Sequence, residues 1–201
     1  MKEFDITPVL THTDTMNEIH AEASERAYQQ VNDTKKGNRN ASYSYGKQNT
    51  IDTRSINKRL EDSQIGCLAE YLGSILTKCT WKKQRRQYND GNREPDLKPI
   101  YKGKETDTEV RGTRSNTIVF RCYGKGRGKD FDRDSDMLLL GVTNLPNGPI
   151  SRVGYLQFGA LKELCRLHPE WYVSDNRGNP YYKVPNNYFH FDGNDFTPNR
   201  G

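Results

Sequence analysis

Three alternating polar residues, Asp107, Glu109 and Arg111, form the part of the sequence best suited to chemistry on a phosphodiester. Residues two apart on a strand face the same side, so this spacing predicts that two carboxylates and a guanidinium share one face. Cleaving a phosphodiester bond needs an activated water and a cation that absorbs charge on the phosphate oxygens. Mg²⁺ is bound by few carboxylates and keeps several waters, so carboxylates beside a cationic side chain supply the minimal apparatus.

Two further carboxylates precede this segment. Asp96 follows Pro95, and the twelve residues between Asp96 and Glu109 suit two strands joined by a turn at residues 102–104. Glu70 stands earlier, on a predicted helix. Which of Asp96 and Asp107 completes the site is left open by the spacing. The predicted metal ligands are Glu70, Asp96, Asp107 and Glu109, and the predicted catalytic residues are these four together with Arg111.

A helix from about residue 56 to 78 would position Glu70. Its apolar residues recur at helical spacing, and Glu70 lies among small residues on a second face. Small residues let a helix approach a sheet closely. After this helix, strands are predicted at 100–101, 108–113, 117–123, 137–143 and 151–157. A short helix at 158–167 is predicted to follow them. The continuous apolar run at 137–143 indicates a central strand buried on both faces.

The remaining N-terminal residues predict a separate extension. Residues 16–31 can form a helix with few apolar positions, which we interpret as peripheral, and 32–50 is a polar segment typical of a flexible linker. We therefore predict an extension over 1–54 and a domain over 55–201 that contains the candidate residues. The predicted fold class is α/β (α+β), with a mixed central β-sheet flanked by helices.

The motif residues resemble those of a known superfamily. Pro95-Asp96 followed by Glu109-Val110-Arg111 is similar to the PD-(D/E)XK motif, with Arg111 at the usual lysine position. The segment 66–70, the E-V-R triplet and the later Val153-Gly154-Tyr155 resemble small phage-encoded nuclease-like proteins. The resemblance covers roughly residues 66–189.

This resemblance implies a restriction-endonuclease-like core and a metal-dependent nuclease that hydrolyses DNA, with Mg²⁺ as the cofactor and Mn²⁺ as an alternative. It also implies a phage or mobile-element origin. Arg111 stays protonated, so it can orient water or stabilise charge but is a poor proton shuttle.

The charge distribution favours a polyanionic partner. Residues 78–133 contain sixteen Lys or Arg and eight Asp or Glu, a net charge of +8, whereas the rest of the chain carries −3. Glycines between the basic residues let a backbone approach phosphates closely. The predicted nucleic-acid-binding residues are Arg114, Arg121, Lys125, Arg127 and Lys129, although the same segment could be a solvated loop.

Several other classes of protein are disfavoured. The chain has no apolar run near the ~18 residues of a membrane span and no apolar core of a signal peptide at its start. It has neither a phosphate-binding P-loop nor an HExxH or HNH-type metal motif. The four widely spaced cysteines are expected to be reduced core thiols. We expect a cytoplasmic protein (host cytoplasm if viral) that binds DNA and no membrane; a homodimer is compatible with this interpretation.

Two other functions fit the same residues. One is a catalytically inactive nucleic-acid-binding protein of the same fold, since Arg111 replaces the usual lysine. The other is a structural or interaction protein, in which Glu109 is a solvent-facing partner of Arg111 and Glu70 an exposed helix residue. The distances among the four carboxylates distinguish these interpretations.

Overall fold

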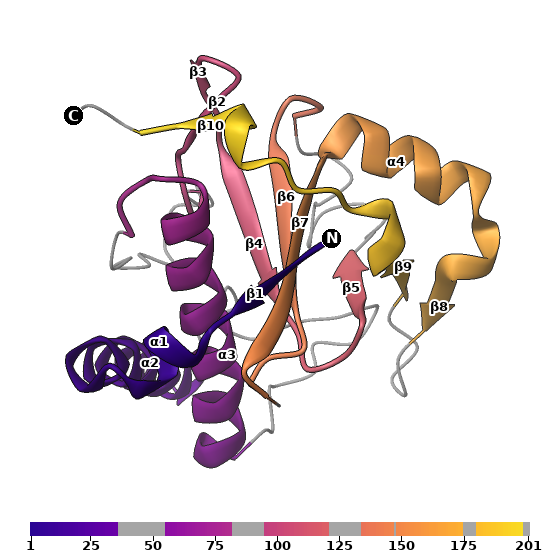
Figure 1. Cartoon of the computed structure of the whole chain (residues 1–201). Coiled ribbons are helices and arrows are strands. Elements are labelled where there is room, and N and C mark those ends of the chain that lie inside the picture. The colour runs from indigo at the N-terminus through magenta and orange to yellow at the C-terminus, as the bar shows by residue number, and fades with distance from the viewer. Residues whose placement is uncertain (36–54, 82–94, 121–133, 147, 175–179, 199–201) are drawn as a thin grey trace.

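The computed structural model describes residues 1–35, 55–81, 95–120, 134–146, 148–174 and 180–198. It combines helices with a mixed sheet, so the predicted α+β fold class is confirmed (Figure 1). The helices are α1 (Thr7–Thr11), α2 (Thr13–Lys35), α3 (Ile56–Leu76) and α4 (Phe158–Leu167). The strands are β1 (Lys2–Asp5), β2 (Ile100–Tyr101), β3 (Lys104–Glu105), β4 (Thr108–Gly112), β5 (Thr117–Phe120), β6 (Leu138–Thr143), β7 (Ile150–Gln157), β8 (Tyr172–Ser174), β9 (Pro180–Pro185) and β10 (Phe196–Thr197).

The central sheet has the strand order β1-β7-β6-β4. The β4–β6 pair is parallel, and the other two pairs are antiparallel. Every residue of β6 is buried, and its side chains alternate between two apolar cores: Leu138 and Leu140 belong to one and Leu139 to the other. The prediction of a central strand buried on both faces is therefore confirmed.

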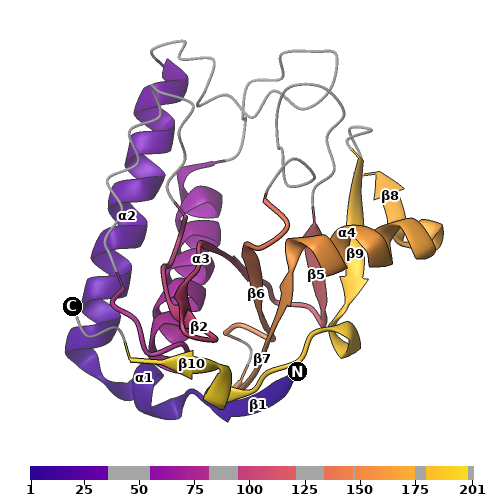
Figure 2. The same ribbon diagram turned by 90° about the horizontal axis from the view of Figure 1, so that it is seen from above.

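Helices flank this sheet on both sides. Figure 2 shows α2 and α3 side by side on one flank, and α4 with the small sheet β5-β9-β8 on the other. The first core lies toward α2 and α3, and the second lies toward α4, β5 and β9. A third small sheet, β10-β2-β3, lies near the start of β4. The predicted turn at 102–104 closes the β2–β3 hairpin, and Lys102 and Gly103 in it adopt positive φ values of 49° and 81°.

Close approach between α3 and the sheet depends on glycine. A methyl group added at Gly73 would lie 2.6 Å from Leu140 Cδ2 and 3.1 Å from Leu97 Cδ1. One added at Gly112 of β4 would lie 2.7 Å from the Cβ of Ala69. Gly73 and Ala69 of α3 therefore pack closely against β6 and β4, which fixes the distance between α3 and the candidate residues on β4. Gly66, predicted to share the small-residue face with Gly73, has no atom within 4 Å of an added methyl group, so only part of that face packs on the sheet.

The first 35 residues join the same core. β1 pairs with β7, and Ile19 and Ala23 of α2 are buried in the core cluster that also contains residues of α3. The helix predicted over 16–31 as a peripheral element is thus longer and has a buried face. The predicted domain boundary at residue 54 and most of the predicted linker lie outside the described residues.

Candidate active site

Asp96 is held against the outer edge of β4. This strand ends the central sheet, and its outer side forms a bridge with the chain at Leu97, through hydrogen bonds of 3.0 Å and 2.9 Å between Leu97 and Thr108. The backbone N–H of Val110 donates to Oδ2 of Asp96 at 2.8 Å, and Asp96 is only 3% exposed. The aspartate of the Pro-Asp pair therefore directly contacts the central residue of the Glu-Val-Arg triplet.

Glu109 is fully buried and is paired with Arg111. The Arg111 Nη1 donates to Glu109 Oε1 at 2.5 Å and to the Val110 carbonyl oxygen at 3.2 Å. The Arg111 side chain is 24% exposed, so the ion pair borders the surface. In the parallel pairing of β4 with β6, Glu109 lies beside Leu139, and Val110 lies beside Leu140. Val110 and Leu140 belong to the core on the side of α3, and successive side chains of a strand point to opposite faces. Glu109 therefore projects from the face of β4 opposite to α3.

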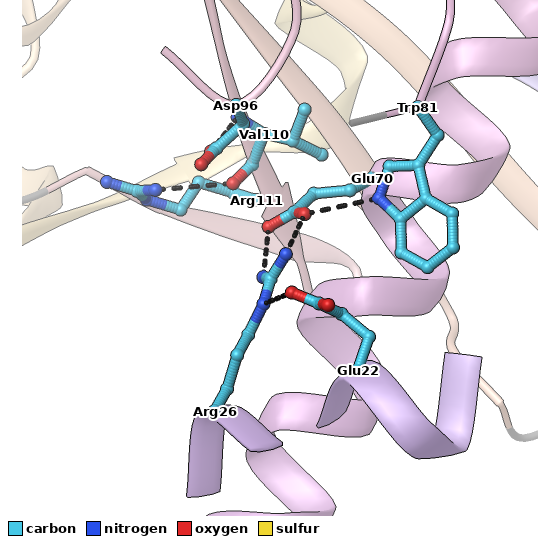
Figure 3. Close-up of polar contacts among 7 residues, drawn as sticks. All are labelled: Glu22, Arg26, Glu70, Trp81, Asp96, Val110 and Arg111. Carbon is cyan, nitrogen blue, oxygen red and sulfur yellow. Dashed lines mark hydrogen bonds and ion pairs between the residues drawn. The ribbon is translucent and has the colours of Figure 1, made fainter. Parts of the chain in front are cut away.

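Glu70 is bound by an arginine from α2. Figure 3 shows its carboxylate directed at Arg26, whose Nη1 and Nη2 donate to the two oxygens at 2.7 Å each. Arg26 Nε donates to Glu22 at 2.7 Å, and Trp81 Nε1 donates to Glu70 at 3.4 Å. Burial disfavours the charge of Arg26, but the hydrogen bonds and charge of Glu70 outweigh this and raise the pKa of Arg26 above its usual value.

Asp107 and Arg114 are placed differently. The side chain of Asp107 is 48% exposed, and its Oδ1 lies 3.9 Å from the Lys98 Nζ. Arg114 lies beside Glu61 of α3, at 3.6 Å. The other predicted nucleic-acid-binding residues, Arg121, Lys125, Arg127 and Lys129, lie outside the described residues.

The structure thus brings three of the predicted residues, Asp96, Glu109 and Arg111, to one short stretch of β4. Glu70 is on α3 beside this stretch but is bound to Arg26, and Asp107 faces solvent next to Lys98. Within the part of the chain that the structure describes, no three His, Cys, Asp or Glu side chains gather in a way that could hold a metal ion.

Sequence reasoning did not identify Arg26, Glu22 or Trp81 as neighbours of the site. The four-residue spacing of Glu22 and Arg26 on a helix indicates that they can pair with each other. No local pattern connects Arg26 with Glu70, which lies 44 residues further along the chain.

Comparison with known proteins gives no relative: no family model, no curated protein and no solved structure matches this chain. Over its described helices, the protein also has no segment with the length and apolar character needed to cross a membrane.

Proposed function

We propose that this chain is a metal-dependent nuclease of the PD-(D/E)XK type that hydrolyses DNA phosphodiester bonds. The observation that supports this most is the hydrogen bond from the Val110 amide to Asp96. It joins Asp96 of the Pro-Asp pair to Val110 of the Glu-Val-Arg triplet, 14 residues further along the chain.

The two carboxylates have the donor chemistry of a magnesium site. Mg²⁺ is usually held by one or two protein carboxylates together with waters and substrate phosphates, so a cluster of three acidic side chains is not required. Both Asp96 and Glu109 are buried, and buried carboxylates are stabilised by a nearby cation. Mg²⁺ or Mn²⁺ bound by these two residues would polarise a phosphate oxygen and lower the pKa of a water.

Arg111 supplies the fixed positive charge of the proposed site. A guanidinium does not deprotonate in proteins, so Arg111 stabilises charge on the phosphate rather than transferring a proton. Its hydrogen bonds to Glu109 and to the Val110 carbonyl hold it in place, and its exposed part can meet a substrate. Asp96 is oriented by the Val110 amide, so neither motif carboxylate needs to reorganise when DNA binds.

The inactive DNA-binding protein of the same fold is the second candidate, and one observation favours it. Glu70 and Glu109 are each paired with an arginine, Arg26 and Arg111, so a protein cation already interacts with each carboxylate. Such pairing can support a folded protein without any metal.

A nuclease assay separates the two candidates. The wild-type protein is incubated with single- and double-stranded DNA in Mg²⁺, Mn²⁺ or EDTA, and DNA binding is measured in parallel. The proposal expects metal-dependent cleavage that Glu109→Gln abolishes, with binding intact or tighter because an anion near the phosphates is removed. DNA binding without cleavage in any metal, by a well-folded protein, would instead identify the inactive relative.

Two matched variants sharpen this assay. Glu105→Gln makes the same change at an exposed strand residue and should leave cleavage unchanged. Asp96→Asn should abolish cleavage, whereas Asp107→Asn should retain it, because Asp96 is buried at the Val110 amide and Asp107 faces solvent. The reverse result would assign the motif aspartate to Asp107.

A further inference from the structure

Residues 192–197 form a short strap that leads from β7 to β2 (yellow in Figure 1). The root of the strap lies on β7, where the Tyr155 N–H donates to the His190 carbonyl oxygen at 2.7 Å. A methyl group added at Gly154 would lie 2.7 Å from the Cβ of Phe189, so the root lies directly on this strand. At the other end, β10 pairs antiparallel with β2. The strap therefore connects the central sheet with the β2–β3 hairpin.

Phe196 is the buried side chain of the strap. It is 1% exposed, and its ring centroid lies 5.1 Å from that of Tyr155 and 5.5 Å from that of Tyr101. Residues 192–195 are exposed or half-buried. An element with few buried apolar contacts opens at a lower free energy than the core strands do. Hydrogen bonds from neighbouring elements are therefore important in keeping the strap closed.

Lys78 supplies two of these hydrogen bonds from the end of α3. Its Nζ donates to the Gly193 carbonyl oxygen at 3.1 Å and to the Phe196 carbonyl oxygen at 2.9 Å. Lys78 follows the C-cap residue Thr77 and has a φ of 57°, a position at which glycine is the usual residue. A lysine is locally unfavourable there, but its side chain reaches the strap, which glycine could not do.

We propose that the strap is a latch: it opens and closes as a unit while the rest of the protein stays folded, and Lys78 is the catch that keeps it closed. Opening withdraws Phe196 from Tyr101 and Tyr155 and releases the β2–β3 hairpin from α3. The chain enters this hairpin from Leu97, which bridges to β4, so the latch controls how firmly the outer edge of β4 is covered. The latch does not depend on the nuclease proposal.

Native-state hydrogen exchange, followed by NMR, tests the latch in the wild type. The reporter is the Lys102 N–H, which donates to the Asp195 carbonyl oxygen in the strap at 2.7 Å. We expect this amide to exchange faster than the amides of β6. Its rate should also change little in low urea, because local opening exposes little surface. Exchange of Lys102 at the rate of the β6 amides, with the same dependence on urea, overturns the proposal.

Lys78→Gly tests the catch. It removes both hydrogen bonds to the strap but suits the positive φ, so the variant should fold, and exchange of the Lys102 amide should speed up at least about fivefold. Asn144→Gly is the matched control, because Asn144 also has a positive φ, 66°, and donates to a carbonyl oxygen, that of Ile150, at 2.9 Å. This bond belongs to the turn after β6, so its loss should leave Lys102 exchange within about twofold of the wild type. Unchanged exchange in Lys78→Gly, or an equal increase in both variants, overturns the proposal.

Discussion

Replacing Gly73 of α3 by Ala should destabilise the protein by about 1–3 kcal/mol, the usual cost of inserting a methyl group into a packed core. The new methyl group would lie 2.6 Å from Leu140 Cδ2 and 3.1 Å from Leu97 Cδ1. Real Cβ atoms do not come as close as the first of these distances, so Leu140 or the helix must move. Leu140 is 1% exposed and Leu97 3% exposed, so neither has free space to enter. Ala favours a helix over Gly by up to about 1 kcal/mol, which offsets only part of this cost.

Gly66, two turns earlier on the same helix, provides the opposite case. A methyl group there meets no atom within 4 Å, so Gly66→Ala should gain the helix preference of about 0.5–1 kcal/mol. The two variants carry the same substitution in the same helix and share this helix preference, so their free energies of unfolding should differ by the cost of inserting the methyl group, about 1–3 kcal/mol.

Urea unfolding followed by circular dichroism measures this difference, and thermal melts should separate the two variants by roughly 2–12 °C. An equal m-value in both would show that the denatured states are comparable. If Gly73→Ala proves as stable as Gly66→Ala, α3 does not approach β6 as closely as described. The position of Glu70 relative to β4 would then be wrong as well.

Three further outcomes follow from individual contacts. Asp96→Ala should lower the free energy of unfolding in urea by about 1–3 kcal/mol, because the buried Val110 N–H loses its acceptor. Asp96→Asn keeps an acceptor oxygen and should lower it less, so equal losses in the two variants would contradict this contact. The side-chain and backbone hydrogen bonds of Thr7 lower the pKa of Asp5, so Asp5 stabilises the fold above about pH 4 and loses that effect as pH falls through its folded pKa. Asp5→Asn should accordingly reduce the difference in urea midpoint between pH 7 and pH 3, and an unchanged difference would count against the Thr7 contact. Burial raises the pKa of the Cys79 thiol more than its hydrogen bond with Thr77 lowers it, so iodoacetamide at pH 8 should modify Cys79 far more slowly in the native protein than in urea.

The helices and strands with a clear hydrophobic pattern in their own residues were predictable from the sequence. The helix expected from about 56 to 78 is α3 at Ile56–Leu76, and the one expected at 158–167 is α4 with the same bounds. The apolar run at 137–143 contains β6, and a strand covered on both faces buries all of its consecutive apolar residues.

The N-terminal elements could not be predicted in the same way. β1 has only four residues, Lys2–Asp5, and its strand structure comes from pairing with β7 rather than from its own residues. On α2, the buried face includes Glu22 and Arg26, which an apolar pattern counts as exposed. Burial of these charges depends on Glu70, so no inspection of the helix alone could reveal it.

For the candidate site, the sequence indicated the residue types but not their grouping. Their spacing from Glu109 made Asp96 and Asp107 equally suitable as the aspartate of the proposed site. The hydrogen bond from Val110 to Asp96 distinguishes the two in the structure. That contact requires the chain before β2 to return along the outer edge of β4, whereas the predicted turn at 102–104 closes a separate hairpin.

The placement of Asp96 also affects how the protein behaves in a crowded solution. The free edge of a sheet exposes N–H groups that can pair with a strand of another molecule, which starts aggregation. At β4 the bridge with Leu97 and the carboxylate of Asp96 occupy this edge, and the charge of Asp96 is itself unfavourable to an incoming strand. Selection for solubility alone would therefore retain an acidic residue here. A protein of this fold without any cleavage activity would still keep Asp96, so an aspartate at this position in related sequences says little about catalysis, whereas a glutamate at the position of Glu109 says much more.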